Sequence, residues 1–289
     1  MPKIGLLLRT YNLSFVKIAR ALSKELASPI ISDVYINDEY DIIIALDSTS
    51  KYTIPLAKAK VKGIVTAAFI HDIRSISHTP IVVMDSGVNP TIQRLRRLTS
   101  LNLIKPFIDK VLTPSQASAN NIQKYVGLNA CVVPLGIDHD VYKPINTSKR
   151  EILGIKFQDD EYLILTVATK KHIIRHAVAI FSRARERLRK ARLIVRGPCD
   201  KSLKGIKGLV CLPPLPEELM PRLYSIADVF LYPSLIEGFG LPILEAMSCG
   251  LPVVAYREDA VTEVMGDAGI LIEPKSINDV VNALMYAIK

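Results

Sequence analysis

Residues 233–255 read PSLIEGFGLPILEAMSCGLPVVA and carry two glutamates, Glu237 and Glu245, on either side of a Gly-Phe-Gly-Leu-Pro turn. The two glycines, Gly238 and Gly240, allow backbone conformations that other residues rarely adopt, and they let a ligand approach the main chain closely. The proline that follows suits the first turn of a helix, where its missing N–H costs nothing. The segment therefore predicts a tight turn followed by a short apolar helix.

This helix is expected over Ile243 to Cys249, with its free N–H groups facing the glycine turn. Such an N-terminus favours phosphate, because the N–H groups and the helix dipole both attract negative charge. Glu245 is expected in the first helical turn, pointing back toward the glycines. Glu237 follows the apolar run Val229 to Tyr232, so both carboxylates can border one crevice at the carboxyl end of a strand. The pattern predicts a site for a diphosphate and for sugar hydroxyls.

The order of these residues resembles the retaining glycosyltransferases of family 4, the group 1 glycosyl transferases with the GT-B fold. The two glutamates, the turn between them and the following Ala-Met-x-x-Gly-x-Pro-Val-Val-Ala carry the resemblance. Further similar segments lie at residues 111–115, 133–138, 216–234 and 263–274. The resemblance is dense from residue 110 to residue 274 and thin before that.

The resemblance implies an α/β protein with two Rossmann-like domains, whose parallel sheets face an interdomain cleft. The N-terminal domain, residues 1–147, would bind the acceptor, and the C-terminal domain, residues 148–289, would bind the nucleotide-sugar donor. Glu237 would then meet hydroxyls of the donor sugar, Glu245 would bond the ribose, and His71 would face the sugar from the acceptor domain. The turn would offer backbone N–H groups to the sugar and the diphosphate from Gly238, Phe239, Gly240 and Leu241.

One departure from the family concerns the cations that hold the diphosphate. Relatives usually carry Gly-Arg after the first strand of the donor domain and a lysine a few residues later. Here residues 168–172 read Ala-Thr-Lys-Lys-His, so Thr169 takes the arginine position in a shortened loop. The sequence does not choose among the nearby cations, which are Lys170, Lys171, Arg175 and Arg196. Pro213 stands where the family often has a glycine beside the nucleotide base, so the identity of the base in the donor is left open.

Apolar runs alternate with helical segments along the chain, which predicts parallel sheets covered by helices. In the first half, strands are expected at residues 4–8, 41–46, 63–69, 81–84, 110–112 and 130–133. In the second half, they are expected at residues 162–167, 192–195, 208–212, 229–232, 252–255 and 269–272. The seam between the domains is expected near residues 144–150, a short polar connection.

Composition favours a globular protein, with 49% hydrophobic and 22% charged residues. The apolar runs are shorter than the roughly 20 residues of a membrane span, and the first residues have too short an apolar core for a signal peptide. A cytoplasmic protein is expected. The cysteines lack metal-ligand spacing and are expected to be reduced core thiols. Asp138-His139-Asp140 resembles a metal-binding Asp-x-Asp, but its flanks match the family's linker, so no metal is expected there.

The net charge of +9 lies mostly in residues 1–147. Within them Ile92, Leu95, Leu98 and Leu101 recur at helical spacing, with arginines between them. Such a helix can rest on an anionic membrane surface. The alternative is an amphipathic helix that packs on the core and exposes a charged face. Nucleic acid is not an expected partner, because the basic stretches lack interleaved aromatic residues. A homo-oligomer is left open.

The residues and the resemblance together predict a retaining hexosyltransferase. It would move a sugar from a UDP- or GDP-linked donor to a glycan, lipid, protein or small-molecule acceptor, without a metal or other cofactor. Glu237 and His71 are the expected catalytic residues. One alternative is a nucleotide-sugar epimerase on the same fold. The other is a non-catalytic protein that binds nucleotide sugars or glycans, which the missing Gly-Arg element favours and the intact glutamate pair disfavours.

Overall fold

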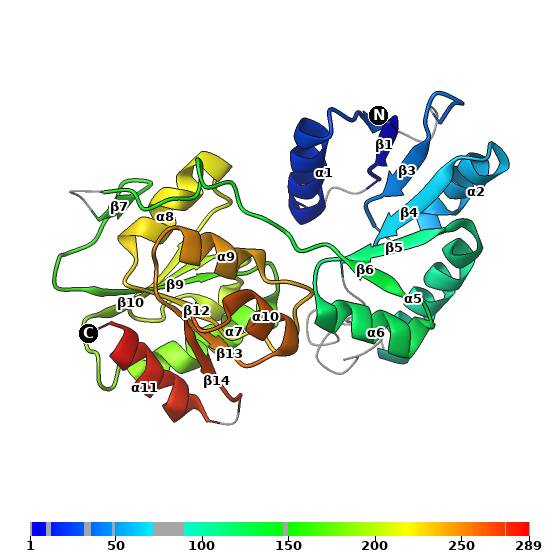
Figure 1. The fold of residues 1–289 in the computed structure, drawn as a ribbon. Coiled ribbons are helices and arrows are strands. Elements are labelled where there is room, and N and C mark those ends of the chain that lie inside the picture. The colour runs from blue at the N-terminus through cyan, green and yellow to red at the C-terminus, as the bar shows by residue number, and fades with distance from the viewer. Residues whose placement is uncertain are drawn as a thin grey trace. The chain divides into compact units, whose positions relative to one another are not determined.

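The computed structural model describes residues 2–9, 13–31, 36–47, 50–71, 90–146, 150–274 and 276–288. The chain divides into two compact units, Met1–Leu135 and Gly136–Lys289. Each unit is an α/β unit built around one six-stranded parallel sheet (Figure 1). None of the helices in the described ranges is both long and apolar enough to cross a lipid bilayer.

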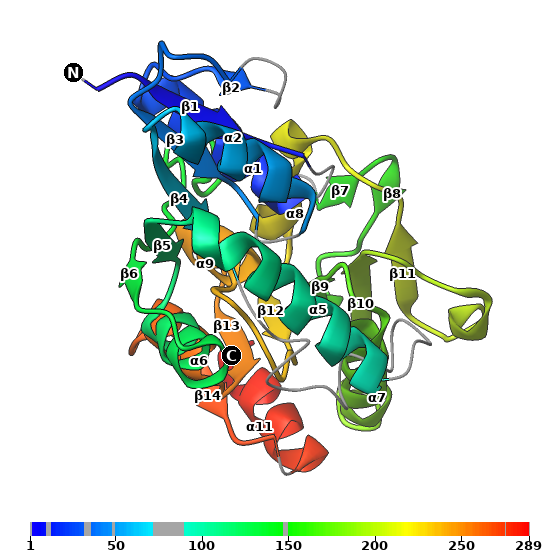
Figure 2. The ribbon, with the colours of Figure 1, turned by 90° about the vertical axis from the view of Figure 1, so that its right-hand side faces the viewer.

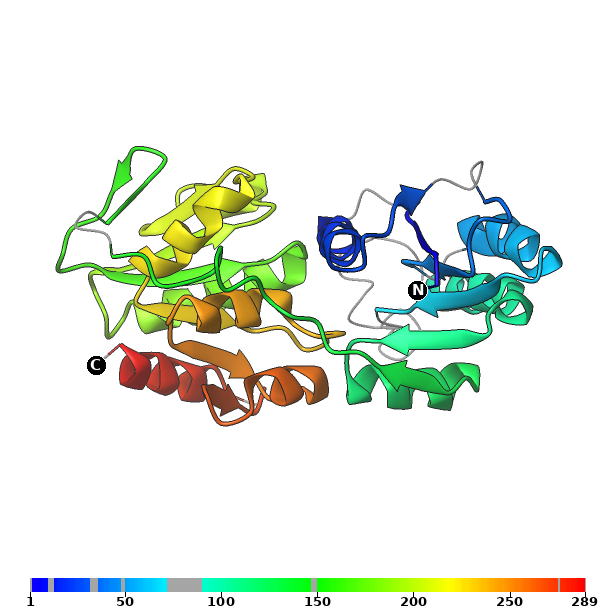
Figure 3. The same ribbon diagram turned by 45° about the horizontal axis from the view of Figure 1, so that its top comes forward.

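The sheet of the first unit has the strand order β2-β1-β3-β4-β5-β6. Its strands are β1 (Ile4–Leu7), β2 (Ile30–Ile31), β3 (Ile42–Ala45), β4 (Val65–Phe69), β5 (Lys110–Thr113) and β6 (Ala130–Val132). Its helices are α1 (Leu13–Glu25), α2 (Thr53–Val61), α5 (Pro90–Ile104) and α6 (Gln116–Val126), with short 3-10 turns η2 (Ser50–Tyr52) and η3 (Lys105–Phe107). Helix α1 covers one face, and the others contribute to the core on the opposite face (Figure 3).

The sheet of the second unit has the order β11-β10-β9-β12-β13-β14, with β9, β10 and β11 side by side in Figure 2. Its strands are β9 (Tyr162–Val167), β10 (Ala191–Arg196), β11 (Leu209–Leu212), β12 (Val229–Tyr232), β13 (Val253–Tyr256) and β14 (Ile270–Ile272). A small antiparallel hairpin precedes the sheet, formed by β7 (Glu151–Ile152) and β8 (Ile155–Lys156).

Helices cover both faces of this second sheet. One face packs against α7 (Lys171–Ala184) and α11 (Ile277–Ala287). The other packs against α8 (Met220–Ile226), α9 (Leu241–Ser248) and α10 (Asp259–Met265) (Figure 1). Two 3-10 turns complete the unit, η4 (Lys201–Leu203) and η5 (Glu217–Leu219). The layers are those of a doubly wound α/β fold.

The strand order reverses between β9 and β12, which identifies a place for a ligand. From β9 the chain moves outward through β10 to β11, and it then returns to the other side of β9 at β12. In open parallel sheets ligands bind outside the carboxyl ends of the strands at such a reversal. Strands β9 and β12 end at Val167 and Tyr232. The loops that follow these two residues are therefore the first place to look for a site.

The strands expected from the sequence are confirmed wherever the structure describes them, with ends that shift by one or two residues. The strand expected at residues 81–84 lies outside the described residues. The unit boundary falls after Leu135, earlier than the seam expected near residue 147. The reason is visible at Tyr142, which is 2% exposed in the core of the second unit and contacts the Tyr224 ring.

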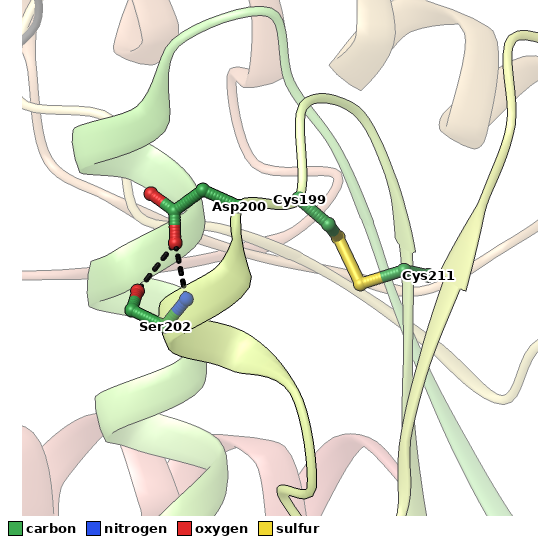
Figure 4. Close-up of a disulfide and its surroundings, with 4 residues drawn as sticks. All are labelled: Cys199, Asp200, Ser202 and Cys211. Atoms are coloured by element: carbon green, nitrogen blue, oxygen red, sulfur yellow. Dashed lines mark hydrogen bonds between the residues drawn. A yellow bond between two sulfur atoms is a disulfide. The ribbon is translucent and has the colours of Figure 1, made fainter.

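The prediction of four reduced core thiols is wrong for three of them. Cys199 and Cys211 form a disulfide (Figure 4). Of the other two cysteines, Cys131 is exposed and Cys249 is a buried free thiol. The pairing follows from the sheet. Cys211 lies on β11 opposite Val195 of β10, and Cys199 comes three residues after the end of β10, so the parallel pairing brings the two sulfurs together.

Candidate functional site

The loop between β12 and α9, residues 233–240, positions Glu237. The half-buried Glu237 carboxylate accepts hydrogen bonds at Oε1 from the Tyr232 hydroxyl at 2.9 Å and from the Ser234 hydroxyl at 2.7 Å. Tyr232 is the last residue of β12, and Ser234 is fully buried. The strand end and the start of the loop thus fix the direction of the carboxylate.

Two other elements border the backbone of the same loop. The ring of His176, on α7, lies near the Pro233 carbonyl. Burial lowers the pKa of His176, and the neighbouring His172 lowers it further, so the ring is neutral near pH 7. After β13, the carboxyl of Glu258 lies near the backbone of Glu237 and accepts hydrogen bonds from the N–H groups of Ala260 and Val261 at 3.1 and 3.2 Å. Groups from α7 and from the loop after β13 thus border the Glu237 loop.

The turn ends at Gly240, which adopts φ +104° and caps α9. A residue with a Cβ is strained at that angle, which explains the glycine. The Gly240 carbonyl accepts from the Ile243 N–H at 2.9 Å, and Pro242 occupies the first turn. Residues 238–240 are buried. The expected turn and helix are confirmed, and the N-terminus of α9 points its dipole at the end of the Glu237 loop.

Glu245 lies deeper than the sequence predicted. Because α9 begins at Leu241, Glu245 is the fifth residue of the helix, so its expected place in the first turn is wrong. Its side chain is 6% exposed and accepts from the Tyr224 hydroxyl at 2.8 Å. Burial and the nearby Glu245 charge raise the pKa of Tyr224 well above its usual range, and the same causes raise the pKa of Cys249 to about 12. Glu245 therefore has neutral hydrogen-bonding neighbours, and its contact with a ribose stays a prediction.

The candidate cations differ sharply in their surroundings. Lys170 and Lys171, at the start of α7, are exposed, and Lys170 makes no side-chain capping bond with any described residue. Arg175 is also exposed and pairs with Asp200 at 3.3 Å. In contrast, the Nε of Arg196 is buried and has no hydrogen-bond partner among the described residues. An unpaired buried donor of this kind is costly unless a ligand satisfies it.

The sheet register places Arg196 on the side of the Glu237 loop. Ile194, two residues earlier on β10, packs in the core under α8 and α9, and strand side chains alternate between faces, so Arg196 lies on that face. Arg196 pairs with Val167 of β9, and β9 also pairs with β12. Continuing the register places Tyr232 in the same row, two strands away, or about 10 Å. An arginine side chain together with a ligand bound between the two strands can span that distance.

The candidate site residue of the first unit is His71. His71 comes two residues after β4, and its carbonyl accepts from the Ser118 hydroxyl at 3.4 Å. Asp72, which follows it, lies outside the described residues. A role for His71 toward the donor sugar stays a prediction.

The Asp138-His139-Asp140 segment forms a turn. The Asp138 carboxylate accepts from the Asp140 N–H at 2.9 Å, and the Asp138 carbonyl accepts from the Tyr142 N–H at 2.8 Å. The His139 ring lies 3.0 Å from the Ser248 hydroxyl, at the end of α9. The aspartates thus shape the start of the second unit.

Sequence reasoning missed His176 and Glu258, which lie near the backbone of the Glu237 loop. Glu258 carried a weak signal, because a carboxylate directly after the apolar strand β13 lies at the same edge of the sheet as Glu237. His176 carried none, since its position depends on which helix covers β12.

Residues 161–289 match the family model described as glycosyl transferases group 1. Over 64 residues the chain is 53% identical to O-antigen chain mannosyltransferase B from Escherichia coli, covering 22% of this chain and 17% of that protein. Over 189 residues it is 33% identical to the MMP alpha-(1->4)-mannosyltransferase of Mycolicibacterium hassiacum, covering 61% of this chain and 44% of that protein. The chain thus spans less than half the length of either relative.

Two solved structures share the fold along nearly the whole chain. HepE from Anabaena, in complex with UDP and glucose, has a TM-score of 0.74 at 17% identity. The match covers 100% of this chain and 90% of HepE. WaaG, a glycosyltransferase involved in lipopolysaccharide biosynthesis, has a TM-score of 0.66 at 16% identity, covering 99% of this chain and 90% of WaaG. The GT-B fold expected from the sequence is confirmed, and the comparisons support the GT-B glycosyltransferase superfamily.

Proposed function

We propose that this protein is a retaining glycosyltransferase of family 4 that transfers a hexose from a nucleotide-diphosphate donor to an acceptor hydroxyl. The observation that carries the proposal is the Glu237 loop. It presents a carboxylate, fixed by the Tyr232 and Ser234 hydroxyls, beside the N-terminus of α9 at the strand reversal. The family match over residues 161–289 includes this whole arrangement.

The proposed transfer uses the site as follows. The acceptor oxygen forms a bond to the anomeric carbon of the sugar, the bond from that carbon to the diphosphate breaks, and the acceptor's proton passes to the departing diphosphate. Negative charge grows on the diphosphate as the bond breaks. The N-terminus of α9 stabilises that charge, because its dipole and N–H groups are already oriented. Glu237 accepts hydrogen bonds from the sugar hydroxyls and fixes the position of the ring. The family resemblance supports retention of configuration.

Arg196 is our choice for the main diphosphate cation. Its Nε is buried and lacks a partner among the described residues, and its place in the sheet row faces the Glu237 loop. Lys170 and Lys171 border the same strand reversal from the loop after β9 and add screened positive charge. Glu245 would anchor the ribose, and the N–H groups of residues 238–241 would contact the sugar and the diphosphate.

The relatives suggest the class of donor. Two curated relatives are named as mannosyltransferases, and the HepE structure contains UDP and glucose. A UDP- or GDP-linked hexose is therefore the proposed donor. The reaction is proposed to need neither metal nor cofactor, since the helix N–H groups and the nearby cations offset the negative charge of the diphosphate. Turnover that requires manganese and stops with EDTA would contradict that part.

The first unit is proposed to bind the acceptor, with His71 facing the sugar, and to rest on an anionic membrane surface. Helix α5 buries Leu101 but exposes 47% of Ile92 and 64% of Leu95. Helix α2 exposes 67% of Ile54 and 89% of Val61, with Lys58 and Lys60 between them. Exposed apolar side chains among cations suit a peripheral contact with anionic lipid. Co-sedimentation with anionic vesicles but not neutral ones is expected, and equal sedimentation would contradict the contact.

The experiment that tests the proposed function follows donors and products together. The protein is incubated with UDP-, GDP- and ADP-hexoses, with and without EDTA, in the presence of a pool of glycans and glycolipids. Release of one nucleoside diphosphate together with a hexose-sized mass gain on an acceptor supports the proposal. An epimerised sugar formed without any acceptor would instead indicate the epimerase. Donor binding without chemistry would indicate a binding protein, which Thr169 at the usual arginine position favours.

A further inference from the structure

Three aromatic side chains form a continuous row in the core of the second unit. They are Tyr224 on α8 and Phe230 and Tyr232 on β12. The Phe230 ring lies 5.7 Å from each tyrosine ring, edge-on to Tyr224 and stacked on Tyr232. Phe230 and Tyr232 share one face of the sheet, because strand side chains two positions apart do so. The three side chains together form the ring row.

Each end of the ring row donates a hydrogen bond to one of the two glutamates. At one end, the Tyr232 hydroxyl donates to Oε1 of Glu237 at 2.9 Å. At the other end, the Tyr224 hydroxyl donates to Oε2 of Glu245 at 2.8 Å. Burial and the Glu245 charge raise the pKa of Tyr224, so this hydroxyl keeps its proton and stays a donor. The two carboxylates are therefore connected through three side chains that pack on one another.

Packing alone does not explain a tyrosine at both ends of the ring row. Phenylalanine fills nearly the same volume, without a hydroxyl whose burial is costly unless it is hydrogen-bonded. Tyr224 is 0% exposed and Tyr232 is 4% exposed, so each hydroxyl needs a partner inside the protein. In both cases a glutamate of the turn and helix is such a partner. Phe230, between them, is fully buried and has no polar group to place.

The Tyr224 end of the row is enclosed by further contacts. The Tyr142 ring lies 6.4 Å from the Tyr224 ring, and the Tyr142 carbonyl accepts from the Ser248 hydroxyl at the end of α9 at 2.6 Å. Helix α9, which carries Glu245, is thus tied to the same group of rings. A close-packed interior transmits a displacement rather than absorbing it. A change at the central ring should therefore move both tyrosine hydroxyls.

We propose that Tyr224 and Tyr232 are positioning residues for the transfer, and that the Phe230 ring between them fixes the two glutamate carboxylates relative to each other. Each tyrosine acts through its glutamate. The inference rests on the proposed function, in which Glu237 meets the sugar and Glu245 anchors the ribose. The ring row then sets the spacing at which the site holds the two ends of the donor.

The two tyrosine hydroxyls should affect different kinetic constants. Tyr232→Phe should lower kcat by ~10-fold with the donor KM changed less than about threefold, because the group aimed at the sugar loses its direction. Tyr224→Phe should raise the donor KM by ~10-fold with kcat changed less than about threefold, the size expected for one lost hydrogen bond to a charged group.

The matched control for the tyrosines is Tyr256→Phe. It removes a hydroxyl from another buried tyrosine at a strand end, on the opposite face of the same sheet. The control should keep the parent kcat and KM. If both constants stay at the parent values in Tyr232→Phe and in Tyr224→Phe, or if both variants change the same constant, the proposal is overturned.

The central ring gives the sharpest test, because the Phe230 side chain cannot hydrogen-bond either glutamate. Phe230→Leu should lower kcat and raise the donor KM together, each by ~5-fold or more, since both carboxylates shift. The control is Phe181→Leu, at a fully buried phenylalanine of α7 on the opposite face. It should lose a similar amount of thermal stability, because it also leaves a cavity, and keep both constants. Parent constants in Phe230→Leu, or the same changes in Phe181→Leu, would overturn the role of the central ring.

Crystal structures of the ligand-free variants test the placement independently of the reaction. The Glu237 carboxylate should move by ~1 Å or more in Tyr232→Phe, the Glu245 carboxylate in Tyr224→Phe, both in Phe230→Leu and neither in Tyr256→Phe. Carboxylates that keep their places in all four variants would overturn the proposal. If the parent transfers no hexose from any donor while the carboxylates move as expected, the proposed function fails and the placement of the two glutamates by the ring row stands.

Discussion

Two loops at the carboxyl edge of the second sheet differ in how they are built. The loop after β12 has its carboxylate fixed by hydrogen bonds from the hydroxyls of Tyr232, at the end of β12, and Ser234. The loop after β9, residues 168–170, presents the exposed Thr169 and Lys170 to solvent. The Glu237 loop is preorganised, whereas the loop after β9 offers long, exposed side chains that adapt.

The difference between the two loops predicts which substitutions should affect activity most. A fixed group loses its function when its direction changes, since the scaffold has already paid the entropy of ordering it. A mobile, exposed charge is screened by solvent and can be replaced by a neighbour. Substitutions at the Glu237 loop should therefore have large and specific effects, and substitutions at the lysines should have small ones.

The largest effect is expected at Glu237. In Glu237→Gln the amide still accepts hydrogen bonds but carries no charge, and loss of one fixed group aimed at the reacting centre costs about 10²- to 10³-fold in turnover. Steady-state kcat at saturating donor measures the effect, and the melting temperature should stay near that of the parent. A loss smaller than about threefold would show that the fixed loop has no part in the chemistry.

The next effect is expected at Arg196. Arg196→Ala removes the half-buried cation on the side of the Glu237 loop, and a charge-assisted bond to phosphate is worth about 1.5–3 kcal/mol. We therefore expect donor binding to weaken by about 10- to 100-fold. Titration calorimetry with the donor and with the free nucleoside diphosphate measures the change. The comparison variant is Arg175→Ala, whose side chain pairs with Asp200. If Arg175→Ala weakens donor binding and Arg196→Ala does not, the diphosphate is held by Arg175 and the assignment to Arg196 is wrong.

A third effect follows from the pKa of Glu258, which burial raises to about 7 from a usual value of 4.5. Between these values the folded protein binds more protons than the unfolded one, so this group's contribution to stability is complete below pH 4.5 and is lost as the pH rises through 7. The loss is about 3 kcal/mol by the linkage relation. The free energy of unfolding of the parent, relative to Glu258→Gln, should fall from pH 5 to pH 8. If the difference in unfolding free energy between the parent and Glu258→Gln does not change with pH, the raised pKa of Glu258 is contradicted.

A smaller effect is expected at the disulfide between Cys199 and Cys211, next to Asp200, which caps η4 through Ser202 (Figure 4). Asp200 also pairs with Arg175. The bond closes a short loop, with the two cysteines 12 positions apart. Chain-entropy reasoning gives such a loop about 2–3 kcal/mol. Cys199→Ser with Cys211→Ser should lower the free energy of unfolding of the second unit by that amount. Cys131→Ser is the control.

The thiol state also bears on where the protein works. Disulfides are rare in cytosolic proteins unless they are redox-active. If the cytoplasmic location expected from the sequence is right, thiol labelling of freshly lysed cells should find Cys199 and Cys211 partly reduced. Complete protection from labelling in such cells would argue against that location.

The smallest effects are expected at the two lysines. Lys170→Ala and Lys171→Ala should each change donor KM by less than about threefold, because both side chains are exposed and each can replace the other. The double substitution should exceed the sum of the two single effects. A loss of 10-fold or more in one single variant would show that the loop after β9 is ordered around the donor, and the contrast between the two loops would disappear.

The sequence predicted the parts of the site that depend on local chemistry. The glycine turn, the start of α9 and the long apolar strands followed from residue types at short range. The two-residue strands β2, β7 and β8 were missed, because so few residues show no periodicity. Glu245 was placed two residues too early in the helix, since the helix includes Leu241 and Pro242.

The relations that sequence reasoning missed all depend on neighbours in the sheet. The disulfide requires β10 beside β11, the place of Glu258 near Glu237 requires β12 beside β13, and the place of His176 near Pro233 requires α7 under β12. The same holds for Arg196, whose relation to the Glu237 loop follows only from the order β10-β9-β12. Strand order is a property of the folded sheet, so these relations became visible only with the structure.

The most direct test of the central claim is the release of nucleoside diphosphate from UDP-, GDP- and ADP-hexoses by three proteins: the parent, Glu237→Ala and Glu218→Ala, a matched change at an exposed glutamate. The account predicts release from one donor by the parent and by Glu218→Ala, and loss of at least 100-fold in Glu237→Ala, as expected for a fixed group at the reacting centre. Release that is equal in all three proteins would contradict the assignment of the site to the Glu237 loop.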